Sequence, residues 1–282
     1  MSTLREKRKK ERRALRRRKT ADWTVVLILC AIAVCCGGYL IYHHWSVKQR
    51  ELEDEKLRQE ETLSAATETV IAEPETEEST EETVIYCDPV YDFGQLHEQN
   101  EDIYAWIVVP GTQVDYPLLQ SETDNYYLDY NLDHSKGYPG CIYTNQCNRK
   151  DFSDYNTVLY RHNMKNGSMF GSIHSFEDET FFDGHPYIYV YTENGRLTYE
   201  IYEAAKFTDV YIPSEYVISS KDDRDQFLAD VREKVSDNKL HVREDMQIGE
   251  EDRLITLSTC VSGERSHRYL VIGVLVETAV YR

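Results

Sequence analysis

The sequence predicts a mainly β domain with a few helices, attached to the outside of a membrane by an N-terminal anchor. Three observations in the 282 residues support this prediction. From residue 84 onward, short runs rich in Val, Ile, Thr and Tyr alternate with turn residues. Residues 221–235 have the apolar spacing of one amphipathic helix. Near the start, a dense basic run precedes about twenty uncharged, mostly apolar residues, which is the length that crosses a bilayer.

Residues 1–22 are a basic segment and residues 23–45 are the candidate membrane span. The basic segment contains eleven Lys or Arg against three Asp or Glu, so the positive-inside rule places it in the cytoplasm. A cleaved signal peptide is the alternative, but Gly37-Gly38 is followed by the apolar run Tyr39 to Tyr42 rather than by a cleavage signal. We therefore expect an uncleaved signal-anchor, which is a single-pass span with the rest of the chain outside the cell.

Residues 46–83 are expected to be an acidic extracellular linker, followed by a folded domain over residues 84–282. The linker is rich in Glu and Thr and has almost no aromatic residue, so it cannot bury enough apolar surface to fold. The whole chain carries a net charge of −18 although its first 22 residues carry +8, so the remainder carries −26. This charge argues against a nucleic-acid partner for the exterior part.

The folded domain is expected to begin with a helix from Asp92 to Ile107, because Phe93, Leu96, Ile103 and Ile107 fall on one helical face. Strands are then predicted at Val114 to Leu118, Gly140 to Thr144, Thr157 to Tyr160, Tyr187 to Tyr191, Leu197 to Ala205, Arg253 to Ser258 and Arg268 to Glu277. Asn194-Gly195 is a strong hairpin signal between two of them. Many short strands indicate a sandwich or a closed barrel, and their spacing does not choose between these folds.

A second helix is predicted from Lys221 to Val235, in the long connection before the strand that begins at Arg253. Ser219 or Ser220 can cap its N-terminus. Phe227, Leu228 and Val231 lie on one face. An amphipathic helix in so long a connection is typical of a functional segment rather than a disordered one.

Cys260 ends the apolar run that starts at Ile255 and is the candidate for chemistry. Buried packing is the alternative for a lone cysteine after a strand. The other exterior cysteines form no CxxC motif, so we expect no metal site and no cofactor. Cys141 and Cys147 are close enough in sequence for a disulfide, whose geometry the sequence does not determine.

A reactive thiol needs a basic neighbour and a donor for the oxyanion that it creates. His162 follows a predicted strand, as Cys260 does, so both side chains could project from one sheet edge. Arg268 opens the next strand, and a strand–loop–strand return would bring its guanidinium beside the thiol. Arg265 competes for this role, but it falls in the predicted loop.

The motifs around these three residues resemble those of class B sortases, membrane-anchored cysteine transpeptidases of Gram-positive bacteria. Thr256-Leu257-Ser258-Thr259-Cys260 resembles their nucleophile signature, and Arg268-Tyr269-Leu270-Val271 resembles their arginine strand. Tyr160-Arg161-His162-Asn163-Met164 resembles their histidine segment, with Arg161 where the family usually has glycine. The resemblance covers about Tyr91 to Tyr281. It implies an eight-stranded β-barrel with N-terminal helices and a helix in the long loop before the nucleophile strand.

The resemblance also implies the reaction. Cys260 would be the nucleophile that cleaves an Asn-Pro-x-Thr-like sorting motif near the C-terminus of secreted proteins, through a thioacyl-enzyme. His162 would be the general acid and base, and Arg268 would stabilise the oxyanion or the substrate. The acceptor would be an amine of a peptidoglycan precursor or of another surface protein. We assign Ser258, Thr259, Asn125 and Leu128 to the substrate groove, with ordinary packing or capping as the alternative for each.

Two other functions stay open on the sequence alone. The same thiol chemistry could deliver the acyl group to water, which would make the protein a surface cysteine peptidase. Alternatively, the domain could be a non-catalytic binding module on a stalk, with Cys260 in a packing role.

Overall fold

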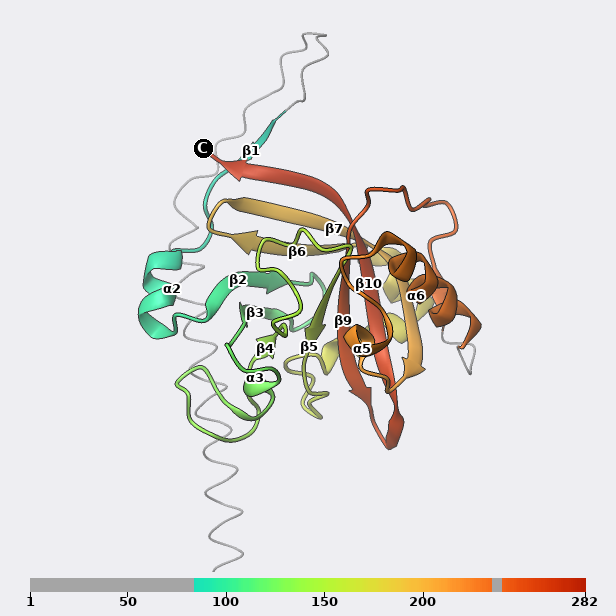
Figure 1. The fold of residues 1–282 in the computed structure, drawn as a ribbon, viewed down its shortest axis with the longest axis horizontal. Helices are drawn as coiled ribbons and strands as arrows, with labels where there is room; N and C mark the ends of the chain where they lie inside the picture. Colours follow the sequence, from blue (N-terminus) through green and yellow to red (C-terminus); the bar gives the residue numbers. More distant parts are fainter. Residues whose placement is uncertain (1–83, 235–239) are drawn as a thin grey trace, which may run out of the picture. The chain divides into compact units, whose positions relative to one another are not determined.

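The computed structural model describes residues 84–234 and 240–282. Eight of its strands form a closed barrel in the order β10-β9-β5-β4-β3-β2-β6-β7, and β7 pairs back with β10 to complete the ring (Figure 1). The barrel strands are β2 (Ile103–Val108), β3 (Asp115–Leu119), β4 (Ile142–Tyr143), β5 (Asn156–Tyr160), β6 (Tyr187–Thr192), β7 (Gly195–Thr208), β9 (Leu254–Val261) and β10 (Glu264–Tyr281). The prediction of an eight-stranded β-barrel is confirmed.

Two short strands extend the ring. β1 (Ile85–Cys87) runs parallel to the end of β10, and β8 (His241–Val242) pairs with β7. The helices are α2 (Phe93–Gln99), α3 (Tyr126–Asp129), α4 (Glu179–Gly184), α5 (Ile212–Glu215) and α6 (Lys221–Glu233), with a 3₁₀ helix η1 (Ser172–Glu177). Among the described residues, no helix is long and apolar enough to cross a membrane. The expected basic segment, span and linker lie outside the described residues.

The predicted helix from Asp92 to Ile107 is wrong in its second half. Asp92 caps α2 by accepting a hydrogen bond from the Gln95 amide at 3.2 Å, but the helix ends at Gln99. Ile103–Val108 is instead strand β2, hydrogen-bonded to β3 on one side and β6 on the other. The β-branched and aromatic residues of this run suit a strand buried on both faces, and sheet pairing overrides the apolar spacing that suggested a helix.

Side chains from all eight barrel strands meet in one internal core, which includes Ile107, Leu118, Leu159, Leu257 and Val271. A second apolar cluster lies on the other face of β5, β7, β9 and β10, beneath α6. It includes Val158, Leu270 and Phe227, and Phe227 is fully buried. The sheet thus has apolar residues on both faces where α6 covers it, and alternation along a strand decides which core a residue joins.

Helix α6 begins where the sequence predicts. The Ser220 side chain caps it by accepting a hydrogen bond from the Asp223 amide at 3.2 Å. Phe227, Leu228 and Val231 are buried against the barrel, as their spacing predicts. These contacts hold α6 on the outer face of the barrel, against β9 and β10.

Candidate active site

His162 and Cys260 are brought together by the parallel pairing of β5 with β9. Tyr160 lies opposite Ser258 in this ladder. The pairing continues past the end of β5, because the Arg161 amide donates to the Ser258 carbonyl at 3.2 Å and the Thr259 hydroxyl donates to the Arg161 carbonyl at 2.8 Å. His162, the next residue, therefore lies at the same edge of the sheet as Cys260 and at the same height along the paired strands.

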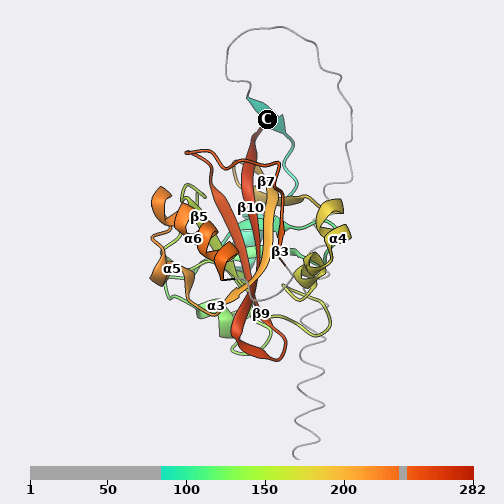
Figure 2. The same ribbon diagram turned by 90° about the vertical axis from the view of Figure 1, so that its right-hand side faces the viewer.

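Arg268 lies directly opposite Cys260 in the antiparallel β9–β10 pair, which runs on to a hairpin (Figure 2). Directly opposed residues of antiparallel strands project from the same face of a sheet. That face also carries Ser258 and Leu270, which are opposed two residues further along. Cys260 and Arg268 therefore project from the outer face of the barrel, the face that α6 covers further back.

The prediction that Arg265 lies in a loop is wrong, since β10 starts at Glu264. The register is interrupted between Glu264 and Arg268, so Arg265 has no partner residue in β9. Regular pairing with β9 resumes at Arg268. The Arg268 Nη1 donates to the carbonyls of His267 at 3.0 Å and Arg265 at 3.3 Å, which anchors one terminal nitrogen of the guanidinium on the hairpin.

The His162 ring is half-buried and has a defined orientation. Its Nε2 lies 3.1 Å from the Leu128 carbonyl, which can only accept, so Nε2 carries the proton and Nδ1 is the basic nitrogen. Burial lowers the pKa of His162, the adjacent Arg161 guanidinium lowers it further, and the Leu128 carbonyl and Asp129 oppose this shift. The ring is therefore mainly neutral near pH 7, as a proton acceptor must be.

Arg161, which stands where the family usually has glycine, is almost completely buried beneath this site. Its guanidinium donates to the Pro139 carbonyl. It also lies against Gly140, whose φ of +76° favours glycine and where an added Cβ would come within 2.8 Å of the arginine Nη1. Arg161 thus supports the loop that presents Tyr138 to the site.

Tyr138 is a site residue that the sequence did not reveal. Its ring centroid lies 5.4 Å from that of His162, and the residue is 40% exposed. Burial raises the pKa of the Tyr138 phenol, Arg161 opposes the shift, and the nearby Cys260 adds to it. Tyr138 therefore borders the space between His162 and Cys260.

The four predicted groove residues occupy different positions. Leu128 is half-buried and holds His162 through its carbonyl. Asn125 is exposed and its backbone is in the left-handed conformation. Its Oδ1 accepts a hydrogen bond from the Tyr143 hydroxyl at 3.0 Å. Ser258 lies beside the trio on the outer face but is only 4% exposed, whereas Thr259 lies opposite Tyr269 of the internal core. Its hydroxyl bonds to the Arg161 carbonyl, so Thr259 ties β9 to the chain that carries His162.

An aromatic wall, made of Tyr143, Tyr160 and Tyr211, extends from Asn125 across the outer face. The ring centroids of Tyr143 and Tyr160 are 5.8 Å apart, and those of Tyr160 and Tyr211 are 5.9 Å apart. The Asn145 amide donates to the Tyr211 hydroxyl at 2.7 Å. Tyr160 could have been found from sequence, because it lies two residues before His162 and therefore on the same face of the strand.

Cys141 and Cys147 each lack a disulfide bond in this structure. Cys141 is buried in the cluster beneath α2, whereas Cys147 is exposed with its sulfur 3.9 Å from the Tyr211 hydroxyl. The possible disulfide between them is therefore not formed.

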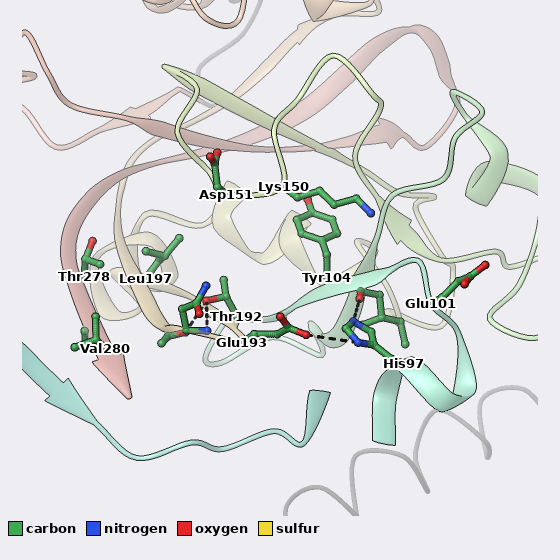
Figure 3. A pocket seen from close by; sticks show the side chains of 14 residues that line it. His97, Glu101, Tyr104, Lys150, Asp151, Thr192, Glu193, Leu197, Thr278 and Val280 are labelled. Carbon is green, nitrogen blue, oxygen red and sulfur yellow. Dashed lines mark hydrogen bonds and ion pairs between the residues drawn. The ribbon is translucent and has the colours of Figure 1, made fainter. Parts of the chain in front are cut away.

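A separate cavity of about 520 Å³ lies at the far end of β10 from Arg268 (Figure 3). His97 and Glu193 face each other there, with 3.5 Å between Nδ1 and Oε1, and Leu197 and Val280 supply apolar lining. None of the residues predicted to be catalytic lines this cavity. It also contains no thiol, so it cannot supply the chemistry that Cys260 offers.

Comparisons with known proteins agree with the geometry. The Sortase domain family model matches residues 107–276, more than half of the chain. Sortase B of Listeria monocytogenes is 34% identical over 168 residues, a match that spans 58% of this chain and 65% of that protein, just under two thirds of its length. Sortase B of Staphylococcus aureus is 27% identical over 191 residues, which cover 66% of this chain and 75% of that protein.

Solved structures show the same relationship. The Staphylococcus aureus sortase B–substrate complex has a TM-score of 0.64 at 26% identity, covering 83% of this chain and 99% of that one. The X-ray structure of Clostridium perfringens sortase B has a TM-score of 0.59 at 29% identity, covering 66% of this chain and 100% of that one. These matches confirm the resemblance that the motifs indicated. The chain belongs to the sortase family, and the relatives that it matches are class B sortases.

Proposed function

We propose that this protein is a sortase-type cysteine transpeptidase in which Cys260 is the nucleophile, His162 the general acid and base, and Arg268 the oxyanion donor. The observation that carries the proposal is the convergence of the three on one outer face of the barrel, with Arg268 opposite Cys260 and His162 at the end of the adjacent parallel strand. A thiol used only for packing would be buried, whereas Cys260 is exposed.

In the first half-reaction, the Cys260 sulfur attacks the backbone carbonyl of the sorting motif. The neutral His162 ring takes the thiol proton as the C–S bond forms, and the Arg268 guanidinium donates hydrogen bonds to the resulting oxyanion. When the intermediate collapses, the peptide C–N bond breaks and His162 delivers its proton to the leaving amine. The product is a thioester between Cys260 and the substrate.

In the second half-reaction, an acceptor amine attacks the thioester. Its nitrogen bonds to the acyl carbon, the C–S bond breaks, and His162 moves the amine proton to the departing sulfur. We propose an amine of a peptidoglycan precursor or of another surface protein as the acceptor. Surface anchoring by residues 23–45, with residues 46–83 as a spacer, would hold the domain outside the cell where both partners are found.

The aromatic wall and Asn125 supply the surface on which we propose that the sorting motif binds. Tyr160, opposite Ser258 in the β5–β9 ladder, stacks with Tyr211, and these rings offer apolar surface. The exposed Asn125 side chain offers a polar group that suits a peptide backbone, while the buried Asn145 amide holds the Tyr211 hydroxyl. An Asn-Pro-x-Thr-like motif is the expected ligand. Support comes from the Staphylococcus aureus sortase B that was solved as a substrate complex, whose fold this chain shares.

The test is a library of peptides with varied Asn-Pro-x-Thr-like motifs, incubated with the full-length protein and examined by intact mass. We expect a covalent acyl adduct on the wild type and on Cys147→Ala, which removes another exposed thiol, but not on Cys260→Ala. An adduct that survives Cys260→Ala would refute the assignment of the nucleophile. Adding a glycine-based amine then separates the two enzymatic functions, because a transpeptidase forms the new amide whereas a peptidase releases only the acid.

A further inference from the structure

The backbone carbonyl of Cys260 is held by two side chains that the reaction described above does not use. Asn163, the residue after His162, donates from Nδ2 to this carbonyl at 2.9 Å and lies 3.1 Å from the Ser262 Oγ. His174 of η1 contributes its Nε2, at 3.1 Å from the same carbonyl oxygen. Two donors from outside β9 thus converge on the backbone of the residue that carries the thiol.

The His174 ring is itself fixed from two directions. Its Nδ1 lies 2.7 Å from Oε1 of Glu177, one helical turn later on η1. Its face stacks on the Tyr269 ring, with centroids 4.9 Å apart and planes at 23°. Tyr269 is fully buried and lies opposite Thr259 in the β9–β10 ladder. The imidazole is therefore locked against the strand pair that carries Cys260 and Arg268.

The partners of His174 require a particular protonation state. A carboxylate and a carbonyl can only accept, so the ring donates to both Glu177 and Cys260 only when both nitrogens carry protons. In a neutral ring that keeps its proton on Nδ1, Nε2 can only accept, and the donor available to it is the Asn163 Nδ2 at 3.0 Å. The hydrogen bond from the ring to the Cys260 carbonyl therefore needs a proton on Nε2.

Several elements packed against His174 and Glu177 contribute groups that face them. Glu177 lies on η1, Asn163 on the loop after β5, Cys260 on β9 and Tyr269 on β10. His241 of β8 approaches from behind, with its Nε2 3.1 Å from the Glu177 carbonyl. Glu177 is the carboxylate that contacts the His174 ring.

We propose that Glu177 and His174 form a positioning dyad, which fixes the Cys260 backbone so that the thiol meets the substrate carbonyl in the reactive orientation. This inference rests on the proposed role of Cys260 as the nucleophile. Neither dyad residue touches the reacting atoms, and both act through the main chain of Cys260.

The experiment measures kcat and KM of acyl-enzyme formation on the full-length protein, with the peptide that gives the largest adduct in the library screen. Because a misplaced nucleophile loses rate rather than substrate affinity, we expect His174→Ala to lower kcat about 10- to 100-fold with KM unchanged. His174→Gln keeps a donor for the Cys260 carbonyl. It should retain kcat within about threefold of the wild type.

His185→Ala is the matched control, since His185 ends α4 and stacks on Phe181 rather than contacting Cys260. A purely structural role would lower the amount of folded protein and leave the kcat of the folded fraction unchanged in both variants. Wild-type kcat in His174→Ala, or a His174→Gln enzyme no faster than His174→Ala, would overturn the dyad. Activity in Cys260→Ala, or no adduct with any peptide, would instead refute the proposed function on which the dyad rests.

Discussion

Replacing Arg268 with Ala should nearly abolish acylation while leaving the fold intact. The structure accounts for both halves of this expectation. One guanidinium nitrogen, Nη1, is used on the hairpin carbonyls of Arg265 and His267. Within the described residues, the other two nitrogens donate to no protein oxygen, so three of the five N–H groups remain for a substrate oxyanion. They project from the same face as the Cys260 thiol.

The magnitudes separate catalysis from stability. Loss of one oxyanion donor costs about 10²- to 10³-fold in kcat, or about 2.7–4 kcal/mol of transition-state stabilisation. The two hairpin hydrogen bonds are half-exposed, so their loss should cost only about 1 kcal/mol of folding free energy. Arg268→Lys keeps the charge but not the fork of donors, and we expect it to remain at least about tenfold slower than the wild type.

The assay is single-turnover formation of the acyl-enzyme, followed by mass, together with a urea unfolding curve for each variant. Arg265→Ala is the matched control, because Arg265 is an exposed arginine on the same hairpin without a partner residue in β9. It should acylate at nearly the wild-type rate. Equal losses in the two alanine variants, or an Arg268→Ala enzyme that keeps more than about a tenth of the activity, would refute the assignment of Arg268.

Three further predictions concern charge and packing. Burial raises the pKa of Glu203 to about 7, so the wild type should lose stability as pH rises from about 4.5 to about 7. In urea unfolding at pH 5 and pH 8, Glu203→Gln should remove up to about 3 kcal/mol of this pH dependence. The same pH dependence in the two proteins would contradict the prediction. Arg161→Met should raise the pKa of His162, measured by NMR of its ring, and move the histidine limb of the acylation profile to higher pH, whereas Arg161→Lys should stay close to the wild type. Phe227→Ala should destabilise the domain by about 3–5 kcal/mol, because Phe227 is fully buried between α6 and the barrel, while the exposed Gln226→Ala on the same helix should change stability little.

The strands and α6 could be predicted from sequence because their signals are local. Asn194-Gly195 marks the β6–β7 hairpin, and Ser220 with Phe227 and Val231 marks α6. Closure of the barrel could not be derived from these signals, since it depends on the long pairing of β7 with β10 between segments distant in sequence. The resemblance of the motifs supplied that expectation. At Ile103–Val108 the apolar spacing was compatible with a helix, and only the neighbouring strands decide the outcome.

The site residues also divide into those that sequence could predict and those that depend on tertiary contacts. The order and sequence context of His162, Cys260 and Arg268 were sufficient to select them. The aromatic wall was not predictable, because Tyr143 comes from β4, Tyr160 from β5 and Tyr211 from the turn before α5. Their approach is a tertiary contact without a sequence signature. His174 also lacks a signal in the sequence, and only folding brings it onto the Cys260 carbonyl.

The pairing of β5 with β9 has a consequence for how such enzymes can diversify. The positions of His162 and Cys260 relative to each other are fixed by this ladder and by the Thr259–Arg161 hydrogen bond. Neither depends on the segment between β7 and β9 that carries α5 and α6. A replacement segment that keeps the apolar contacts of α6 with the barrel could therefore be exchanged between relatives without moving His162 and Cys260. Chimaeras that transplant it should change which peptide is accepted and leave the chemistry in place, so new specificities can arise by exchange of this one segment.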